Sequence, residues 1–258
     1  MNSLGKSIIR FWNSSIGKKL LVGVTGIVLV LFLMGHLAGN LLTFQGRHAM
    51  NDYAEFLHTM LHGSGIWIAR VVLITVFVLH ILATIALTRE NRAAKPEKYQ
   101  CDATVAASRS SRIMIWSGLV VLAFVLFHIL HFTVRVSPAL ANLPDPSNPG
   151  RHDVWGMVIK GFQNPLVVGF YVIALTLLCS HLSHGIASIF QTLGLSTRQT
   201  RSAIEKFSQV LAIIIWLGFI SIPLSIAFGY GRAGAGIQAS VTKPPVVTVD
   251  PEKVKQHP

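Results

Sequence analysis

The chain has 258 residues, of which 52% are hydrophobic and only 12% are charged, and its mean hydropathy is +0.56. A water-soluble domain of this length carries roughly twice that charged fraction, so the composition predicts an integral membrane protein. The formal net charge of +12 comes from short basic clusters between apolar runs. That pattern is typical of membrane topology and lipid contact, and we expect no nucleic-acid partner.

The amino-terminal segment precedes a long apolar run over residues 20–44. Around the short amphipathic segment IIRFW it carries the basic residues Lys6, Arg10, Lys18 and Lys19. The apolar run is too long for a secretory signal and lacks a small-residue cleavage site, so it predicts a first transmembrane helix. His36 lies inside this helix, between Gly35 and Gly39. Their GxxxG spacing indicates either close helix packing or room for a flat ligand.

A short amphipathic helix is predicted on the membrane surface between the first and second spans. Its apolar side repeats at helical spacing, at Tyr53, Phe56, Leu57, Met60 and Leu61. Its polar side includes Asp52 and Glu55, the carboxylates nearest this edge of the membrane. Such a pattern is typical of a helix that lies in the membrane interface.

Two further spans carry histidines well inside their apolar runs. Residues 66–88 form the predicted second span, with His80 inside it. Residues 113–134 form the predicted third span, in which His128 and His131 are three apart and therefore on one helix face.

The fourth and fifth spans follow a proline-rich connection. In that connection Asp153 is expected to cap a short helix from Val154 to Phe162. The fourth span, residues 165–191, holds His181 and His184. The fifth, residues 208–230, has no histidine, and its Pro223 predicts a kink.

The loops set the predicted orientation. The amino end and the two loops on the same side carry 4, 6 and 3 Lys or Arg residues, more than the short loops opposite, so the amino terminus is expected in the cytoplasm. The fold class is therefore an all-α, five-span bundle that forms one domain over residues 1–258. The tail, residues 242–258, has the composition of a disordered segment, and we expect it to be extended and pinned by a neighbouring subunit.

Four of the histidines fall into two layers of equal depth. With a rise of 1.5 Å per residue, His36 and His128 lie about 24 and 22 Å from the cytoplasmic face, and His80 and His181 lie about 13 to 15 Å from it. Two pairs of imidazoles, one from each of four helices, are what two stacked bis-histidine haems require. Each neutral ring gives one nitrogen to iron, and its other N–H bonds a carbonyl or hydroxyl.

Two other interpretations of these histidines stay open. They are either hydrogen-bonded core residues or members of a proton relay. Proton relays in membranes usually include buried Asp, Glu, Lys or Arg, and the apolar runs have none at depth.

Specific segments around these histidines resemble a known family. They are LFLMGHLAGNLLTF, VFVLHILATIALT, SRIMIWSGLVVLAFVLFHILHFT, GFQNP and SHLSHGIASIFQTLGL. Over essentially its full length the chain resembles the five-helix, two-haem cytochrome b anchor of succinate:quinone oxidoreductase, which is succinate dehydrogenase or fumarate reductase.

This resemblance implies a set of ligands. His80 and His181 would hold the proximal haem, nearer an iron–sulfur subunit, and His36 and His128 the distal haem. His131 and His184 are the alternative ligands if the register is off by one turn. Otherwise they are candidates to bind a haem propionate or a quinone, as are Arg112, Gln191, Ser111, Arg47 and Arg135.

The resemblance also implies cofactors, partners and a role. The cofactors would be two haem b groups and a quinone, with menaquinone favoured over ubiquinone. The partners would be an iron–sulfur subunit and a flavoprotein that carries out succinate oxidation, both on the cytoplasmic side of a bacterial inner membrane. The oligomeric state of the complex stays open. This chain would pass electrons to or from quinone. Asp52 and Glu55 would handle quinol protons, or would simply form a solvated helix face.

Two rival functions remain. The first is a two-haem cytochrome of another respiratory enzyme, such as nitrate reductase or hydrogenase, although those families typically place two ligands on one helix. The second is a haem-free transporter or structural membrane protein.

Overall fold

A computed structural model describes residues 3–93 and 109–231 of the chain. In this part of the chain five helical segments are long and apolar enough to cross a membrane, which confirms the predicted all-α, multi-pass membrane architecture. They are Ser15–Gln45, Gly65–Ala93, Met114–Val134, Pro165–Thr192 and Arg201–Ala227. The predicted orientation stays a prediction, and the predicted tail lies outside the described residues.

Two of the five spans change helix type at one end. The first span consists of α2 (Ser15–Leu41) and the 3-10 helix η1 (Leu42–Gln45). The third consists of α5 (Arg109–His128) and η2 (Ile129–Val134), a π-helix. The others are α4 (Gly65–Ala93), α8 (Pro165–Thr192) and α9 (Arg201–Ala227).

Several helices extend beyond their predicted ends. The polar residues there either cap the helix or form an ion pair with a neighbouring helix. Helix α2 begins five residues earlier than its apolar run, where the side chain of Ser14 accepts a hydrogen bond from the backbone N–H of Gly17. The buried Lys18 of α2 bonds Glu90 at 2.7 Å, so both α2 and α4 continue past the apolar core. At α8, Asn164 caps the first turn and Pro165 takes the first helical position, where a missing N–H costs nothing.

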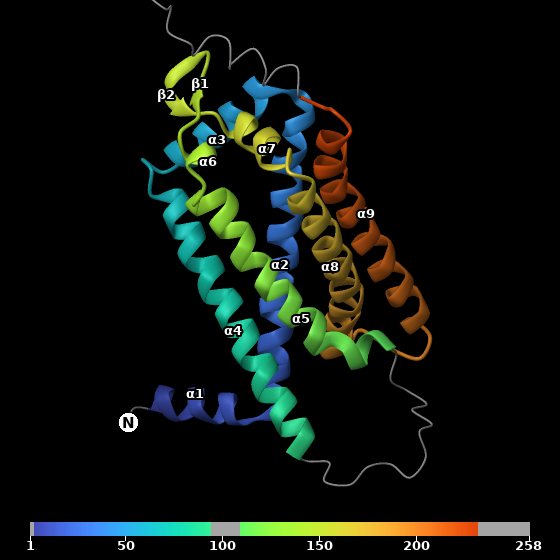
Figure 1. Cartoon of the computed structure of the whole chain (residues 1–258). Helices are drawn as coiled ribbons and strands as arrows, with labels where there is room; N and C mark the ends of the chain where they lie inside the picture. Colours follow the sequence, from blue (N-terminus) through green and yellow to red (C-terminus); the bar gives the residue numbers. More distant parts are fainter. Residues whose placement is uncertain (1–2, 94–108, 232–258) are drawn as a thin grey trace, which may run out of the picture.

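The spans pack in the order α4, α2, α8, α5, and α9 covers α2 and α8 (Figure 1). Helix α8 is the centre of the bundle, because it packs against α2, α5 and α9. Helix α4 packs against α2 among the spans, and α5 against α8, whereas α4 and α5 are not closely packed together. The histidine-bearing helices thus form an open four-helix arrangement, and the histidine-free α9 lies outside it.

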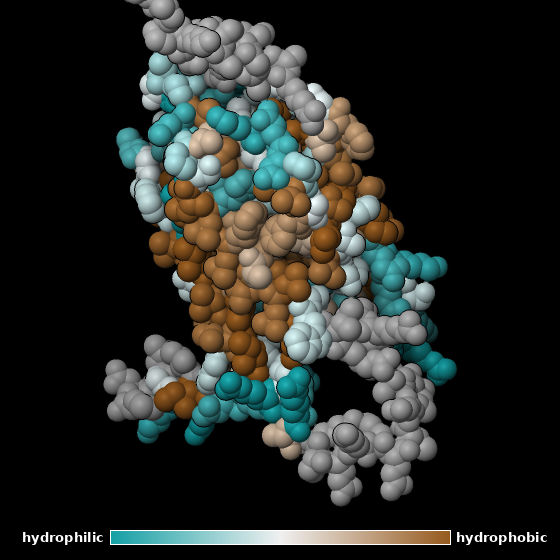
Figure 2. All heavy atoms as spheres, viewed as in Figure 1, coloured by the Kyte–Doolittle hydropathy of each residue, from teal (hydrophilic) through white to brown (hydrophobic). Residues whose placement is uncertain are grey.

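Two further features frame the bundle. Helix α1 (Ser3–Asn13) runs crosswise at one end of the spans (Figure 1). In Figure 2 apolar residues cover the middle of the visible face and hydrophilic residues gather toward its two ends. This distribution matches a hydrocarbon belt between two aqueous surfaces.

Short elements close the opposite end of the bundle. They are α3 (Arg47–Thr59), α6 (Pro138–Ala141), α7 (Val154–Gly161) and a hairpin of β1 (Pro144–Asp145) and β2 (Asn148–His152). We call these elements the outer cap. The predicted helix after Asp153 is confirmed, and the Asp153 side chain accepts from the N–H of Gly156 at 2.9 Å. The hairpin and α6 were not predicted.

Asn51 ties the outer cap together from a position that is 1% exposed. Its amide nitrogen donates to Asp145 at 2.9 Å and to Asp153 at 3.0 Å, and its amide oxygen accepts from the backbone N–H of Trp155 at 3.0 Å. Both aspartates are fully buried. One amide therefore supplies hydrogen-bond donors to two buried carboxylates.

Replacing Asn51 by Ala should destabilise the outer cap. Both buried carboxylates lose a donor, and a buried polar group left without a partner costs about 1 to 3 kcal/mol. We expect a lower thermal midpoint in detergent and faster proteolysis between residues 142 and 153. The control is Asn148→Ala at the exposed start of β2. Equal effects of the two changes would contradict this role.

The outer cap should also weaken in acid. Burial opposes the charge of Asp145, but hydrogen bonds from Ser147, Asn51 and Arg151 outweigh it and hold the pKa of this carboxyl well below its usual range. A depressed folded pKa gives stability that is present above the unfolded value of about 4 and lost as pH falls below it. Asp145→Asn should flatten the acid side of a thermal-midpoint profile; an unchanged slope would count against this assignment.

Candidate functional site

The outer pair of histidines meets across the bundle. His36 on α2 and His128 on α5 have ring centroids 5.8 Å apart, with their planes nearly perpendicular at 87°. Helices α2 and α5 are not closely packed neighbours, so the two side chains reach toward each other through the middle of the four-helix arrangement. Neither ring is fully buried by protein atoms.

The Nε2 nitrogen of His36 is an acceptor. The amide nitrogen of Asn40 donates to the backbone carbonyl of His36 at 2.7 Å and lies 3.3 Å from His36 Nε2. An amide N–H has no lone pair to offer, so the lone pair in this contact belongs to Nε2. In this contact the lone pair of Nε2 is taken by Asn40, so a metal bound at Nε2 would replace the contact with the amide.

The inner pair, His80 on α4 and His181 on α8, is close enough for the two rings to interact electrostatically. Each ring is held from a neighbouring helix by a hydroxyl. Thr25 Oγ1 lies 3.0 Å from His80 Nδ1, and Ser117 Oγ lies 3.2 Å from His181 Nδ1. Like α2 and α5, helices α4 and α8 are not closely packed neighbours.

Tyr171 of α8 bridges His128 and His131. Its hydroxyl lies 3.2 Å from the Nδ1 atom of each ring. A phenol has one hydrogen, so it donates to one ring and accepts from the other. His131 lies on the π-helix η2, and its ring packs on Phe132 with centroids 4.1 Å apart. Of the two candidates, it is His128 whose ring meets His36.

The other inner candidates lie on α8 and in the first turn of α5. His184 is partly buried and interacts electrostatically with His181 and with Glu205 of α9. Gln191 is exposed near the end of α8. Arg112 and Ser111 lie in the first turn of α5, and their side chains are outside the described part of the structure.

Of the two predicted outer arginines, Arg47 belongs to the outer cap and Arg135 follows η2. Arg47 stacks over the Trp155 ring, with its guanidinium carbon 4.9 Å from the ring centroid, and its Nε lies 3.3 Å from Asp153. Arg135 ends η2 in a left-handed conformation. Burial and the nearby Arg135 lower the pKa of His152, and Asp153 opposes this shift.

Asp52 and Glu55 form ion pairs. Arg151 Nη1 donates to Asp52 at 2.7 Å and to Glu55 at 2.6 Å, and its Nε donates to Asp145 at 2.7 Å. These three carboxylates raise the pKa of Arg151. The two predicted carboxylates therefore anchor the hairpin to α3, and their proposed part in proton transfer stays a prediction.

The two glycines beside His36 have different surroundings. A Cβ at Gly39 would lie 2.7 Å from the Tyr53 ring, which is too close, so this glycine allows tight packing of α3 on α2. A Cβ at Gly35 would meet no atom within 4 Å. Gly39 therefore supports the close-packing interpretation, whereas Gly35 is exposed and the flat-ligand interpretation stays a prediction.

The histidine pairs fit a haem by the chemistry of their donors. Among the described residues no group of three or more His, Cys, Asp or Glu side chains is placed to hold a metal ion. A porphyrin supplies four nitrogens itself, so two imidazoles complete its iron. Imidazole nitrogens bind transition metals at about 2 Å, which places two ring centres on one metal roughly 6 Å apart. The 5.8 Å between His36 and His128 is compatible with that spacing.

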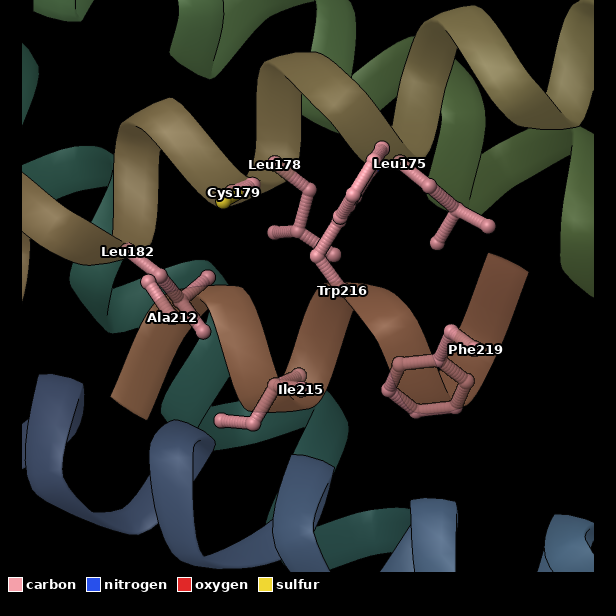
Figure 3. A pocket seen from close by; sticks show the side chains of 8 residues that line it. All are labelled: Leu175, Leu178, Cys179, Leu182, Ala212, Ile215, Trp216 and Phe219. Carbon is pink, nitrogen blue, oxygen red and sulfur yellow. The ribbon is translucent and has the colours of Figure 1, made fainter. Parts of the chain in front are cut away.

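A small apolar crevice lies elsewhere, between α8 and α9 (Figure 3). Its lining residues are Leu175, Leu178, Cys179, Leu182, Ala212, Ile215, Trp216 and Phe219. No histidine lines it, but the ring of the lining residue Phe219 has its centroid 5.8 Å from that of His36.

Comparison of the chain with protein-family models, with curated proteins and with solved structures finds no match. Inference about function therefore depends on the residues and their geometry.

Sequence reasoning did not identify Thr25, Ser117 and Tyr171 as partners of the histidines. A polar residue in an apolar run can indicate a contact with another helix. A Ser or Thr hydroxyl in a transmembrane helix, however, commonly bonds the backbone of its own helix. The chain has several such residues, and only their contacts with other helices single these out.

Proposed function

We propose that the chain is a two-haem membrane cytochrome b, and specifically the membrane anchor of a succinate:quinone oxidoreductase. The observation that carries the haem assignment is that His36 and His128 meet across helices that are not closely packed neighbours. His80 and His181 are close enough to interact electrostatically. A buried neutral histidine needs a hydrogen-bond partner for each ring nitrogen, and the rings of His36 and His128 also face each other across the bundle. The narrower assignment to succinate:quinone oxidoreductase rests on the sequence resemblance.

His36 and His128 would hold the outer haem, and His80 and His181 the inner one. When bound, haem supplies one-electron transfer at an iron whose potential depends on its axial ligands and their surroundings. The residues of the chain hold the rings in place, and the surrounding apolar spans exclude water. Four neutral imidazoles bury no net charge, which suits a site in hydrocarbon.

The two haems would carry electrons between an iron–sulfur subunit at the inner face and a quinone in the membrane. The basic loops expected on the inner side would face the iron–sulfur subunit, with the flavoprotein beyond it. This assignment makes the chain part of an enzyme, whereas succinate oxidation would occur on the flavoprotein.

Single replacements of the four histidines by Ala test the haem assignment. Each should remove one haem and spare the other, because each site has its own pair of ligands. Reduced-minus-oxidised spectra of purified variants measure this loss. His131→Ala and His184→Ala should retain both haems, and His58→Ala on the exposed face of α3 is a matched control. If any of the four single variants keeps two haems, that residue is not a ligand.

Replacing Asp52 and Glu55 by Asn and Gln tests the predicted proton role. We expect quinone-dependent turnover to fall several-fold with both haems retained. Arg151→Gln separates the two explanations, because it breaks the same ion pairs but keeps both carboxylates. An equal fall in both variants, or unchanged turnover in the double variant, would contradict a proton-transfer role.

A further inference from the structure

The two inner histidines are held in the same way from opposite sides of the site. Thr25 and Ser117 are each only 4% exposed. Each is followed by a glycine that lies beside the same ring: a Cβ at Gly26 would be 3.7 Å from His80 Cε1, and a Cβ at Gly118 would be 3.6 Å from His181 Cε1. A hydroxyl–glycine pair thus faces an imidazole twice, once from α2 and once from α5.

The hydroxyl hydrogens are already committed to the helix backbone. Thr25 Oγ1 donates to the carbonyl of Leu21 at 2.6 Å, with the carbonyl of Val22 at 3.1 Å, and Ser117 Oγ donates to the carbonyl of Met114 at 3.0 Å. A hydroxyl has one hydrogen and two lone pairs. In each contact with an imidazole the hydroxyl oxygen is therefore the acceptor, and the ring Nδ1 carries the proton.

This assignment fixes the other ring nitrogen. A neutral imidazole with its proton on Nδ1 has an unprotonated Nε2. The hydrogen bond also sets the rotation of the ring about its own side chain. A donor N–H held by an acceptor makes the opposite nitrogen more basic and orients it for a metal.

We infer that Thr25 and Ser117 are positioning residues that select the Nδ1–H tautomer of His80 and His181 and aim their Nε2 atoms at one inner haem. This inference rests on the proposed function. Tyr171 differs, because its single hydroxyl is shared between two rings, whereas Thr25 and Ser117 each face one ring.

Thr25→Val and Ser117→Ala test this inference. Each removes the acceptor and leaves the ring in a space of similar shape. The inner haem should move to a higher midpoint potential, because its ligand becomes less basic, and its affinity should fall by about tenfold or more. The outer haem should keep its potential and serves as an internal measure of folding. Optical redox titration and the electron paramagnetic resonance signal of each oxidised haem report both effects.

Matched variants separate this role from packing. Thr75→Val on α4 and Ser221→Ala on α9 remove hydroxyls that bond their own helices, and should change neither haem. Thr25→Ser and Ser117→Thr retain the hydroxyl, so the midpoint potential and the affinity of the inner haem should match those of the unmodified protein.

Two failures are distinguishable. If the unmodified protein contains no haem, the proposed function fails and this inference with it. If it contains two haems, but Thr25→Val and Ser117→Ala match their controls or disturb both haems equally, the inference fails and the proposed function stands.

Discussion

An imidazole inside a membrane span must have a partner for each of its nitrogens, and this constraint organises the structure. Hydrocarbon offers no water, so an unpaired ring nitrogen costs free energy. In the inner layer, hydroxyls on α2 and α5 take one nitrogen of His80 and of His181. The remaining nitrogens then need a second partner, and in the proposed assignment a metal shared between two rings would satisfy both at once. The helix order is compatible with this proposal, because α2 and α5, and α4 and α8, are not closely packed neighbours.

A second set of buried polar contacts holds the outer cap. The outer histidine pair lies toward the end of the bundle closed by α3, α7 and the hairpin, where His131 packs beneath α7: a Cβ at Gly161 would lie 3.3 Å from its ring. This cap is held by buried charge rather than by apolar area alone. Asn51 joins two buried aspartates, and Arg151 links the hairpin to α3. Directional hydrogen bonds restrict the positions of side chains more than apolar packing does. Because these bonds involve carboxylates, the cap loses stability when acid protonates them.

The sequence predicted the five spans well because apolar length is a strong signal in a membrane protein. Helix ends were predicted less well, since Lys18 and Glu90 pair beyond the apolar runs, and their partnership joins residues far apart in the chain. Depth counting predicted that His36 and His128 share one layer, and their ring centroids lie 5.8 Å apart. The same counting did not identify Thr25, Ser117 or Tyr171, because which hydroxyl faces which ring depends on helix rotation. Nor did it show that Asp52 and Glu55 share Arg151, which lies 96 residues or more away in the chain.

The central claim is that the bundle holds two haems between two histidine pairs. The most direct measurement is the haem-to-chain ratio of the protein purified from its own membranes, by haem extraction together with quantitative amino-acid analysis. The account predicts two haem b groups per chain, with a flavoprotein and an iron–sulfur protein in the same preparation. A purified, folded chain without haem would contradict it.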